Sequence, residues 1–363
     1  AVPASLSVIS TDDPTLAEAG KRARPWDIMN EEEENLPQPF LLAPLHPDCL
    51  VPILGRDGRL VGLLVLGPRL SEEPYSREDK QLLASVAAQA GIALESIRLG
   101  EEIAERIEAE RRATQEMEFA RQVQSRLFPQ KFPDLRTLEY AGGCAPARQV
   151  GGDYYDFLEL RPGRLALVLA DIAGKGVSGA LLMANLQANL RSQYAMALDD
   201  ICQLLSSVNR LFYENTSDNS YATLFFADYD DSTHRLRYVN CGHLPPLLLR
   251  KGGSTPTSLN PPSNIERLDS TSTVLGLFEN WECNVSETSL GPGDTLLLYT
   301  DGVTEAANSG GEEFGESQLV ELLRSHQDLD AQPLLDSIIQ AVQTFSAEEQ
   351  ADDITLVVAR CRP

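Results

Sequence analysis

After residue 138, seven short apolar runs constrain the fold more than any other feature of the chain. They are rich in strand-forming residues and occupy residues 154–160, 164–170, 223–230, 235–240, 245–250, 295–300 and 354–361. Two connections, residues 161–163 and 230–234, are short enough to make antiparallel hairpins of the runs they join. Apolar residues at helical spacing occupy residues 177–195, 199–215, 317–325 and 331–345. The pattern predicts an α+β domain with largely antiparallel sheets and helices outside them.

The 363 residues include 54 Asp and Glu against 30 Lys and Arg, a formal net charge of -24. This acidic balance disfavours nucleic acids and anionic membranes as partners, because both attract Lys and Arg. No run approaches the roughly 20 apolar residues of a membrane span, and residues 1–10 lack the basic start of a signal peptide. We therefore expect a cytoplasmic protein of two or three domains. The chain opens at Ala1 without a Met, which leaves open that it is a fragment.

The cysteines are widely scattered and form no CxxC pair that would hold zinc. They are Cys49, Cys144, Cys202, Cys241, Cys283 and Cys361. We expect ordinary thiols.

Residues 1–40 contain several prolines and little periodicity, so we expect irregular structure there. Residues 49–54 and 59–67 predict a hairpin, and Ser76 begins an apolar-periodic helix. Residues 45–98 resemble the second half of a GAF domain, a small sensory module of signalling proteins. The resemblance implies a truncated GAF-like α/β domain over residues 1–98, which acts either as a ligand sensor or only as a dimerisation platform.

Residues 99–128 predict a helical linker with few apolar positions, among them Ile103 and Ile107. One apolar seam on a charged helix fits a parallel two-stranded coiled coil. We therefore expect a homodimer through the N-terminal region and the linker. A monomeric charged helix is the alternative. Pro129 and Pro133 end the linker, and residues 129–363 form the last domain.

Aspartates stand where apolar runs meet loops. They are Asp153, Asp171, Asp301 and the adjacent pair Asp352 and Asp353. A strand places its last residue at the rim of a sheet, so we expect these carboxylates to gather there. Gathered carboxylates repel each other unless a cation lies between them, and oxygen-only donors favour Mg²⁺ or Mn²⁺ over zinc. The alternative is that each Asp forms a turn or a cap.

The register of the first hairpin decides whether two of these aspartates share a face. Ideal pairing around the turn at residues 161–164 sets Asp153 opposite Ile172, which would direct the Asp153 and Asp171 side chains to opposite faces. We therefore predict that the two residues are close, and the register stays open.

Five motifs, in this order along the chain, resemble the metal-dependent PPM (PP2C-type) serine/threonine phosphatases, specifically the bacterial RsbU/SpoIIE class. They are VGGDYYD, LADIAGKG, NCGHLPPLLL, LGPGDTLLLYTDGVTEA and ADDITLVV. The resemblance covers residues 118–361 and implies a four-layer α/β/β/α sandwich of two antiparallel sheets. It also implies hydrolysis of phosphoserine or phosphothreonine in a regulatory protein, such as an anti-sigma factor antagonist.

The same resemblance implies two ions, Mn²⁺ or Mg²⁺, per active site, which activate a water for in-line attack without a phosphoenzyme. The implied metal ligands are Asp153, Asp171, the carbonyl of Ile172, Asp301, and Asp352, with a one-residue ambiguity between Asp352 and Asp353.

The sequence departs from the animal-type members of that family near the metal site. They carry a His two residues after the Asp171 position, where this chain has Ala173, so that His cannot protonate the leaving group. Arg148 is a candidate phosphate contact, and an exposed, salt-bridged Arg is the alternative. His243 is either an acid or a residue that hydrogen-bonds the backbone.

Two other functions compete with this interpretation. Residues 174–179 satisfy GxGxxG between a strand and a helix, which makes a nicotinamide-dependent oxidoreductase the alternative enzyme. A second helix, rather than a parallel strand, follows the first, which favours a tight turn beside a metal site. The non-enzymatic alternative is a catalytically silent partner-binding module, which would have no physical need for the four aspartates.

Overall fold

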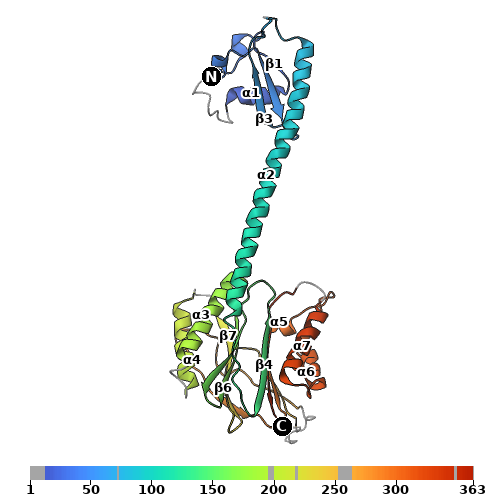
Figure 1. The fold of residues 1–363 in the computed structure, drawn as a ribbon. Helices are drawn as coiled ribbons and strands as arrows, with labels where there is room; N and C mark the ends of the chain where they lie inside the picture. The colour runs from blue at the N-terminus through green and yellow to red at the C-terminus, as the bar shows by residue number, and fades with distance from the viewer. Residues whose placement is uncertain are drawn as a thin grey trace. The chain divides into compact units, whose positions relative to one another are not determined.

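The computed structural model describes residues 13–71, 73–194, 200–216, 220–251, 264–346 and 350–362. The chain divides into two compact units, Ala1–Ala113 and Thr114–Pro363. One helix, α2 (Arg77–Ser125), has residues in both units (Figure 1). The predicted boundary between the GAF-like domain and the linker, at residue 98, therefore lies inside a continuous helix.

The N-terminal unit contains a three-stranded antiparallel sheet in the order β1, β2, β3. The described elements of this unit before α2 are, in chain order, α1 (Pro14–Arg22), β1 (Trp26–Asp27), η2 (Glu33–Asn35), η3 (Ala43–Leu45), β2 (Cys49–Leu54) and β3 (Leu60–Leu66). At the start of α1, Asp13 accepts the Thr15 N–H at 2.8 Å, and Pro14 occupies the first turn. The expectation of irregular structure over residues 1–40 is therefore wrong for α1 and β1.

Helix α2 packs on this sheet through the buried residues Ala87 and Gly91. A Cβ on Gly91 would lie 2.0 Å from the Leu54 carbonyl oxygen, so only glycine permits the approach. Further along the helix, Ile103 and Ile107 are 57% and 47% exposed.

One part of α2 also has the composition of a membrane span. Among the described residues, an 18-residue window of this helix has a mean hydropathy of 1.3, and 11% of the window is buried. The expectation that no stretch is long and apolar enough is therefore wrong. A single such helix is weak evidence for a membrane protein, because core helices of soluble proteins pass the same test.

The C-terminal unit contains two five-stranded sheets in which neighbouring strands pair antiparallel. The first has the order β10 (Ile265–Arg267), β9 (Leu247–Leu249), β12 (Thr295–Tyr299), β13 (Ile354–Cys361), β4 (Leu138–Ala145). The second has the order β11 (Ser286–Ser289), β8 (Arg235–Cys241), β7 (Ala222–Asp230), β6 (Arg164–Ile172), β5 (Tyr154–Arg161). All seven apolar runs form strands, and β4, β10 and β11 are additions that the sequence did not predict.

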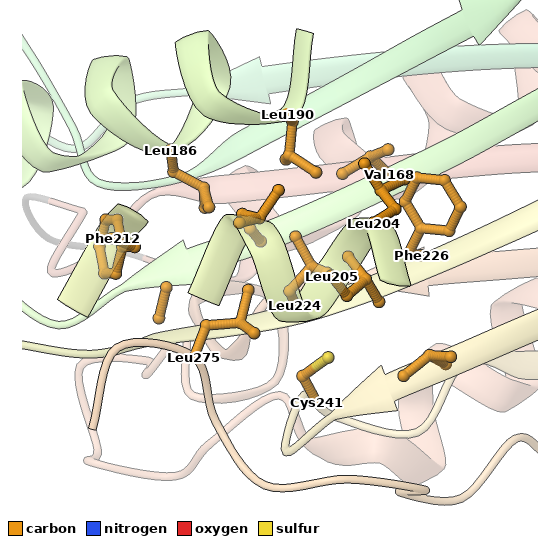
Figure 2. Close-up of a cluster of buried hydrophobic side chains, with 14 of the residues drawn as sticks. Val168, Leu186, Leu190, Leu204, Leu205, Phe212, Leu224, Phe226, Cys241 and Leu275 are labelled. Atoms are coloured by element: carbon orange, nitrogen blue, oxygen red, sulfur yellow. The ribbon is translucent and has the colours of Figure 1, made fainter. Parts of the chain in front are cut away.

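Three hydrophobic clusters arrange these elements in four layers. Helices α3 (Val177–Gln193) and α4 (Ile201–Glu214) pack on the outer face of the second sheet, and Leu186 and Leu205 of these helices belong to one buried cluster with Phe226 of the sheet (Figure 2). Helices α6 (Gly315–Ser325) and α7 (Ala331–Phe345) pack on the first sheet, and a third cluster lies between the sheets. The predicted α+β fold, an α/β/β/α sandwich of antiparallel sheets, is confirmed.

Cys202 of α4 and Cys283, before β11, form a disulfide with a Cα–Cα distance of 5.9 Å. The expectation of ordinary thiols is therefore wrong for this pair. A sequence separation of 81 residues gave no spacing signal from which the pair could be recognised.

Candidate active site

The predicted aspartates come from both sheets of the C-terminal unit. In the second sheet, Asp153 directly precedes β5 and Asp171 lies in β6. In the first sheet, Asp301 begins α5 (Asp301–Thr304) after β12, and Asp352 lies two residues before β13. The buried Thr300 hydroxyl links the sheets, because it donates a hydrogen bond to Asp153 Oδ2 at 2.7 Å. The fold therefore gathers aspartates from both sheets at one rim.

A β-bulge decides the register between β5 and β6. Tyr154 pairs with Ala170, so continuing the ladder by one residue sets Asp153 opposite Asp171. The register shifts by one near the end of β5, where an extra residue enters the strand. The ideal pairing, with Asp153 opposite Ile172, is therefore wrong, and the two aspartates belong to the same face of the sheet.

Asp352 and Asp353 have different partners. Asp352 has a side chain that is 41% exposed, and it forms an ion pair with Lys175 Nζ at 2.7 Å. Asp353 is buried and accepts the Ala147 N–H at 2.8 Å. A Cβ on Gly151 would lie 1.8 Å from the Asp353 carboxylate, so this carboxylate rests directly on the glycine backbone. Asp353 thus holds the segment that contains Ala147 and Gly151 in place. Asp352 is the more accessible of the two carboxylates.

Burial and mutual repulsion raise the pKa values of the rim carboxyls. Burial first, and then the charges of Asp301 and Asp352, raise the pKa of Asp171 to about 7. Burial followed by the Asp352 charge raises the pKa of Asp301. Burial and the Asp171 charge raise the pKa of Asp153 well above its ordinary value. Each shift indicates that the ionised site lacks compensating positive charge.

The cavity beside these aspartates is lined by Asp171, Asp352, Lys175 and glycine backbone, and no His or Cys occurs among the described residues around it. Its volume of about 20 Å³ accommodates a water-sized occupant. Within the part of the chain that the structure describes, no three His, Cys, Asp or Glu side chains converge on one metal position. The donor chemistry nevertheless fits Mg²⁺ or Mn²⁺: Asp352 would exchange its partner Lys175 for the ion, and Asp153 would use the carboxylate oxygen that Thr300 does not contact.

Two cationic side chains flank the same cavity. Lys175 is paired with Asp352, whereas Arg148 is exposed and has no carboxylate partner among the described residues. The Arg148 guanidinium lies 3.7 Å from where a Cβ would stand on Gly176. Arg148 is therefore at the cavity mouth, and the salt-bridged alternative is not what the described residues show.

The glycine motif forms a turn between β6 and α3, with Gly176 at a φ of 68°. Helix α3 leads into α4, and both neighbours of β6 run antiparallel to it. A dinucleotide-binding fold needs a parallel strand after the first helix. The nicotinamide-dependent alternative is therefore wrong.

His243 is buried, and both of its ring nitrogens have protein partners. Nδ1 lies 2.8 Å from Thr223 Oγ1, and Nε2 lies 3.2 Å from the Tyr299 carbonyl oxygen. Burial lowers the pKa of His243 to about 4, so the ring is neutral at pH 7 and its Nε2–H donates to the carbonyl. This arrangement agrees with the interpretation of His243 as a residue that hydrogen-bonds the backbone.

Sequence reasoning missed two residues at this rim. Thr300 bonds to Asp153, and Gln124 bonds to the backbone of Gly151 through its amide. An uncharged Thr or Gln gives no chemical signal in a sequence. The one available signal was position, since Thr300 immediately precedes Asp301.

Known proteins share this architecture. The family model Stage II sporulation protein E (SpoIIE) matches residues 161–362, and a GAF domain model matches residues 15–95. Phosphoserine phosphatase RsbU of Bacillus subtilis is 28% identical over 246 residues, which are 68% of this chain and 70% of RsbU. Protein IcfG of Synechocystis is 30% identical over 269 residues, with 67% of this chain and 41% of IcfG covered.

The fold of a solved structure agrees as well. The SiaA-PP2C domain of Pseudomonas aeruginosa superimposes with a TM-score of 0.60 at 21% identity, over 69% of this chain and 98% of that domain. The GAF match begins at residue 15, which extends the resemblance expected over residues 45–98 toward the N-terminus. The SpoIIE match covers more than half of the 363 residues. The chain therefore belongs to the SpoIIE family of PP2C-type serine/threonine phosphatases, with a GAF domain before the phosphatase domain.

Proposed function

We propose that the protein hydrolyses phosphoserine or phosphothreonine in a regulatory protein, using two Mn²⁺ or Mg²⁺ ions held by the rim aspartates. The single observation that carries this proposal is the gathering of aspartates from both sheets beside a cavity whose described lining offers a metal ion carboxylate and backbone oxygens and no His or Cys. The name of the relative RsbU, phosphoserine phosphatase, supports the substrate class. An anti-sigma factor antagonist is the regulatory protein that we propose.

The rim residues would form two metal sites. Asp153, Asp171 and the Ile172 carbonyl would hold one ion, and Asp301 and Asp352 would hold the other. When bound, the ions would supply positive charge for the phosphoryl group and lower the pKa of the attacking water. We assign Asp353 to positioning, because its carboxylate already bonds backbone.

The two cations at the cavity would contact the phosphate. Hydrolysis breaks the bond between phosphorus and the seryl or threonyl oxygen, and negative charge develops on the oxygens of the transferring group. Arg148 is free to meet these oxygens, and Lys175 would become free once a metal ion replaced it at Asp352. The side chain at position 173 is a methyl group and supplies no proton to the leaving oxygen.

A hydrolysis assay with the full chain tests the proposal. We expect release of phosphate from a phosphoserine peptide with Mn²⁺ or Mg²⁺, and none after chelation with EDTA. Asp301→Asn should abolish turnover in a folded protein, whereas the exposed Asp269→Asn should not change it. A chain that binds the phosphoprotein but never hydrolyses it would instead be the catalytically silent module.

We further propose that the protein is a cytoplasmic homodimer, with two α2 helices paired through Ile103 and Ile107. The support is the exposure of both side chains on a helix that is otherwise charged over this stretch. Light scattering of the full chain and of the double variant Ile103→Glu, Ile107→Glu is the test. A wild-type chain that stays monomeric at tens of micromolar would rule out the dimer.

A further inference from the structure

The last turn of α2 is bonded to the chain segment that leads to Asp153. Gln124 Nε2 donates to the Gly151 carbonyl oxygen at 2.7 Å, and Gln124 Oε1 accepts the Gly151 N–H at 3.1 Å. The amide side chain thus pairs with both polar groups of one residue's backbone, as a neighbouring strand would. Gln124 is 9% exposed, so water competes little for these bonds.

Gly151 is held from two directions. The Asp353 carboxylate lies against the side of Gly151 where a Cβ would stand, and the Gln124 amide bonds the N–H and the C=O of Gly151. Gly151 lies two residues before Asp153, too few for the chain to absorb a displacement. Removing the Gln124 amide would leave a buried N–H and a buried C=O without these partners, which costs more than an exposed hydrogen bond does.

The contact between Gln124 and Gly151 depends on its hydrogen bonds rather than on close packing. A cavity of about 150 Å³ lies beside it, lined by Gln124, Phe128, Cys144 and Asp153 among others. Close packing therefore does not hold the segment on that side. The segment that follows α2 is bonded to the phosphatase fold, because Gln187 Nε2 of α3 donates to the Leu127 carbonyl oxygen at 3.2 Å.

We propose that Gln124 is a positioning residue for Asp153, so that the last turn of α2 sets the affinity of the site for its metal ion. The inference rests on the proposed metal-dependent function and adds a residue that touches neither metal nor phosphate. Because α2 is continuous from Arg77 to Ser125, a rotation of its final turn would move Gly151 and change the position of Asp153.

The test uses the full chain with Gln124→Leu, which keeps the size of the side chain and removes both hydrogen bonds. The matched control is Gln122→Leu, an exposed amide of the same turn that, among the described residues, donates to Glu118 alone. Binding of Mn²⁺ to each chain is measured by electron paramagnetic resonance of the free ion, with no substrate present. We expect the Kd for Mn²⁺ to rise about tenfold or more in Gln124→Leu and to change less than about twofold in the control.

Two further readouts separate positioning from a loss of structure. Hydrogen exchange of the peptide around residues 150–153, measured without metal, should become faster in Gln124→Leu alone. Hydrolysis should show a raised Mn²⁺ requirement and a kcat that recovers toward wild type at saturating Mn²⁺. If Gln124→Leu does not fold, Gln124→Glu keeps one oxygen for the Gly151 N–H and should give the same changes.

The outcomes distinguish this inference from the proposed function. Wild-type affinity for Mn²⁺ in a folded Gln124 variant overturns the positioning role and leaves the phosphatase proposal intact. A wild-type chain that neither binds Mn²⁺ nor hydrolyses phosphoserine overturns the proposed function and, with it, this inference. A higher Kd together with faster exchange in Gln124→Leu alone supports the inference.

Discussion

Replacing Asp171 by Asn should stabilise the metal-free protein while it abolishes catalysis. In the folded protein, burial and the neighbouring charges raise the pKa of Asp171 from 3.8 to about 7. That difference corresponds to about 4 kcal/mol of unfavourable free energy when the carboxylate is ionised. Because Asp171 is only partly buried, water screens part of this, and we expect Asn to recover about 2 kcal/mol. In a unit of this size, that is a rise in Tm of roughly 4–8 °C.

The pH dependence gives this prediction its sign. A carboxyl with a raised pKa holds its proton more tightly in the folded protein, so its stabilising effect is complete below about pH 4. The effect is lost as the pH rises toward about 7, and the loss is constant above that. The gain from Asp171→Asn should therefore be near zero at pH 4 and largest above pH 7.

Thermal unfolding in EDTA, followed by circular dichroism from pH 4 to 8.5, measures the effect. The exposed Asp269→Asn is the control and should follow the wild type at every pH. With saturating Mn²⁺ the order should reverse, because the ion stabilises only the chain that binds it. A difference in Tm that does not depend on pH, or a variant less stable than wild type at pH 8 in EDTA, would refute the reasoning.

Three further changes test other contacts. Thr300→Val removes the hydrogen bond to Asp153 and should weaken Mn²⁺ binding severalfold with little change in fold, as measured by metal titration. Asp353→Asn should lower the free energy of unfolding by about 1–2 kcal/mol in urea denaturation, because it weakens the buried hydrogen bond that the carboxylate accepts from the Ala147 N–H. Cys202→Ser should lower it by about 2–4 kcal/mol in oxidising buffer and by much less under dithiothreitol, because the cross-link to Cys283 closes an 81-residue loop. Equal stability of Cys202→Ser and wild type in oxidising buffer would contradict the last prediction.

The layered fold could be predicted because each strand carries its own signal. β6 is buried on both faces, with Leu165 and Leu167 between the sheets and Val168 against the helices, so its sequence is continuously apolar over residues 165–170. Short strands with exposed residues, such as β11, have no such signal and were missed. Helix α1 was missed although Asp13 and Pro14 form a recognisable start.

The candidate site could be predicted only in part. A charged residue at the end of an apolar run stands out in a sequence, so the positions of the aspartates could be predicted. The register between β5 and β6 could not be read, because a bulge inserts a residue without any sequence mark that distinguishes it from a regular strand. Gln124 could not be recognised from the sequence, because its partner Gly151 is 27 residues away.

The placement of the aspartates on both sheets has a consequence for the amount of protein in the cell. Cations at this rim would bind to ligands that come together only when both halves of the sandwich are folded, so their binding would stabilise the folded state. At a free metal concentration 100 times the Kd, this adds about 2.7 kcal/mol to the stability of the folded state. Proteases degrade the unfolded fraction, and that fraction would grow when metal is scarce. Manganese starvation would then reduce the abundance of the phosphatase as well as its turnover.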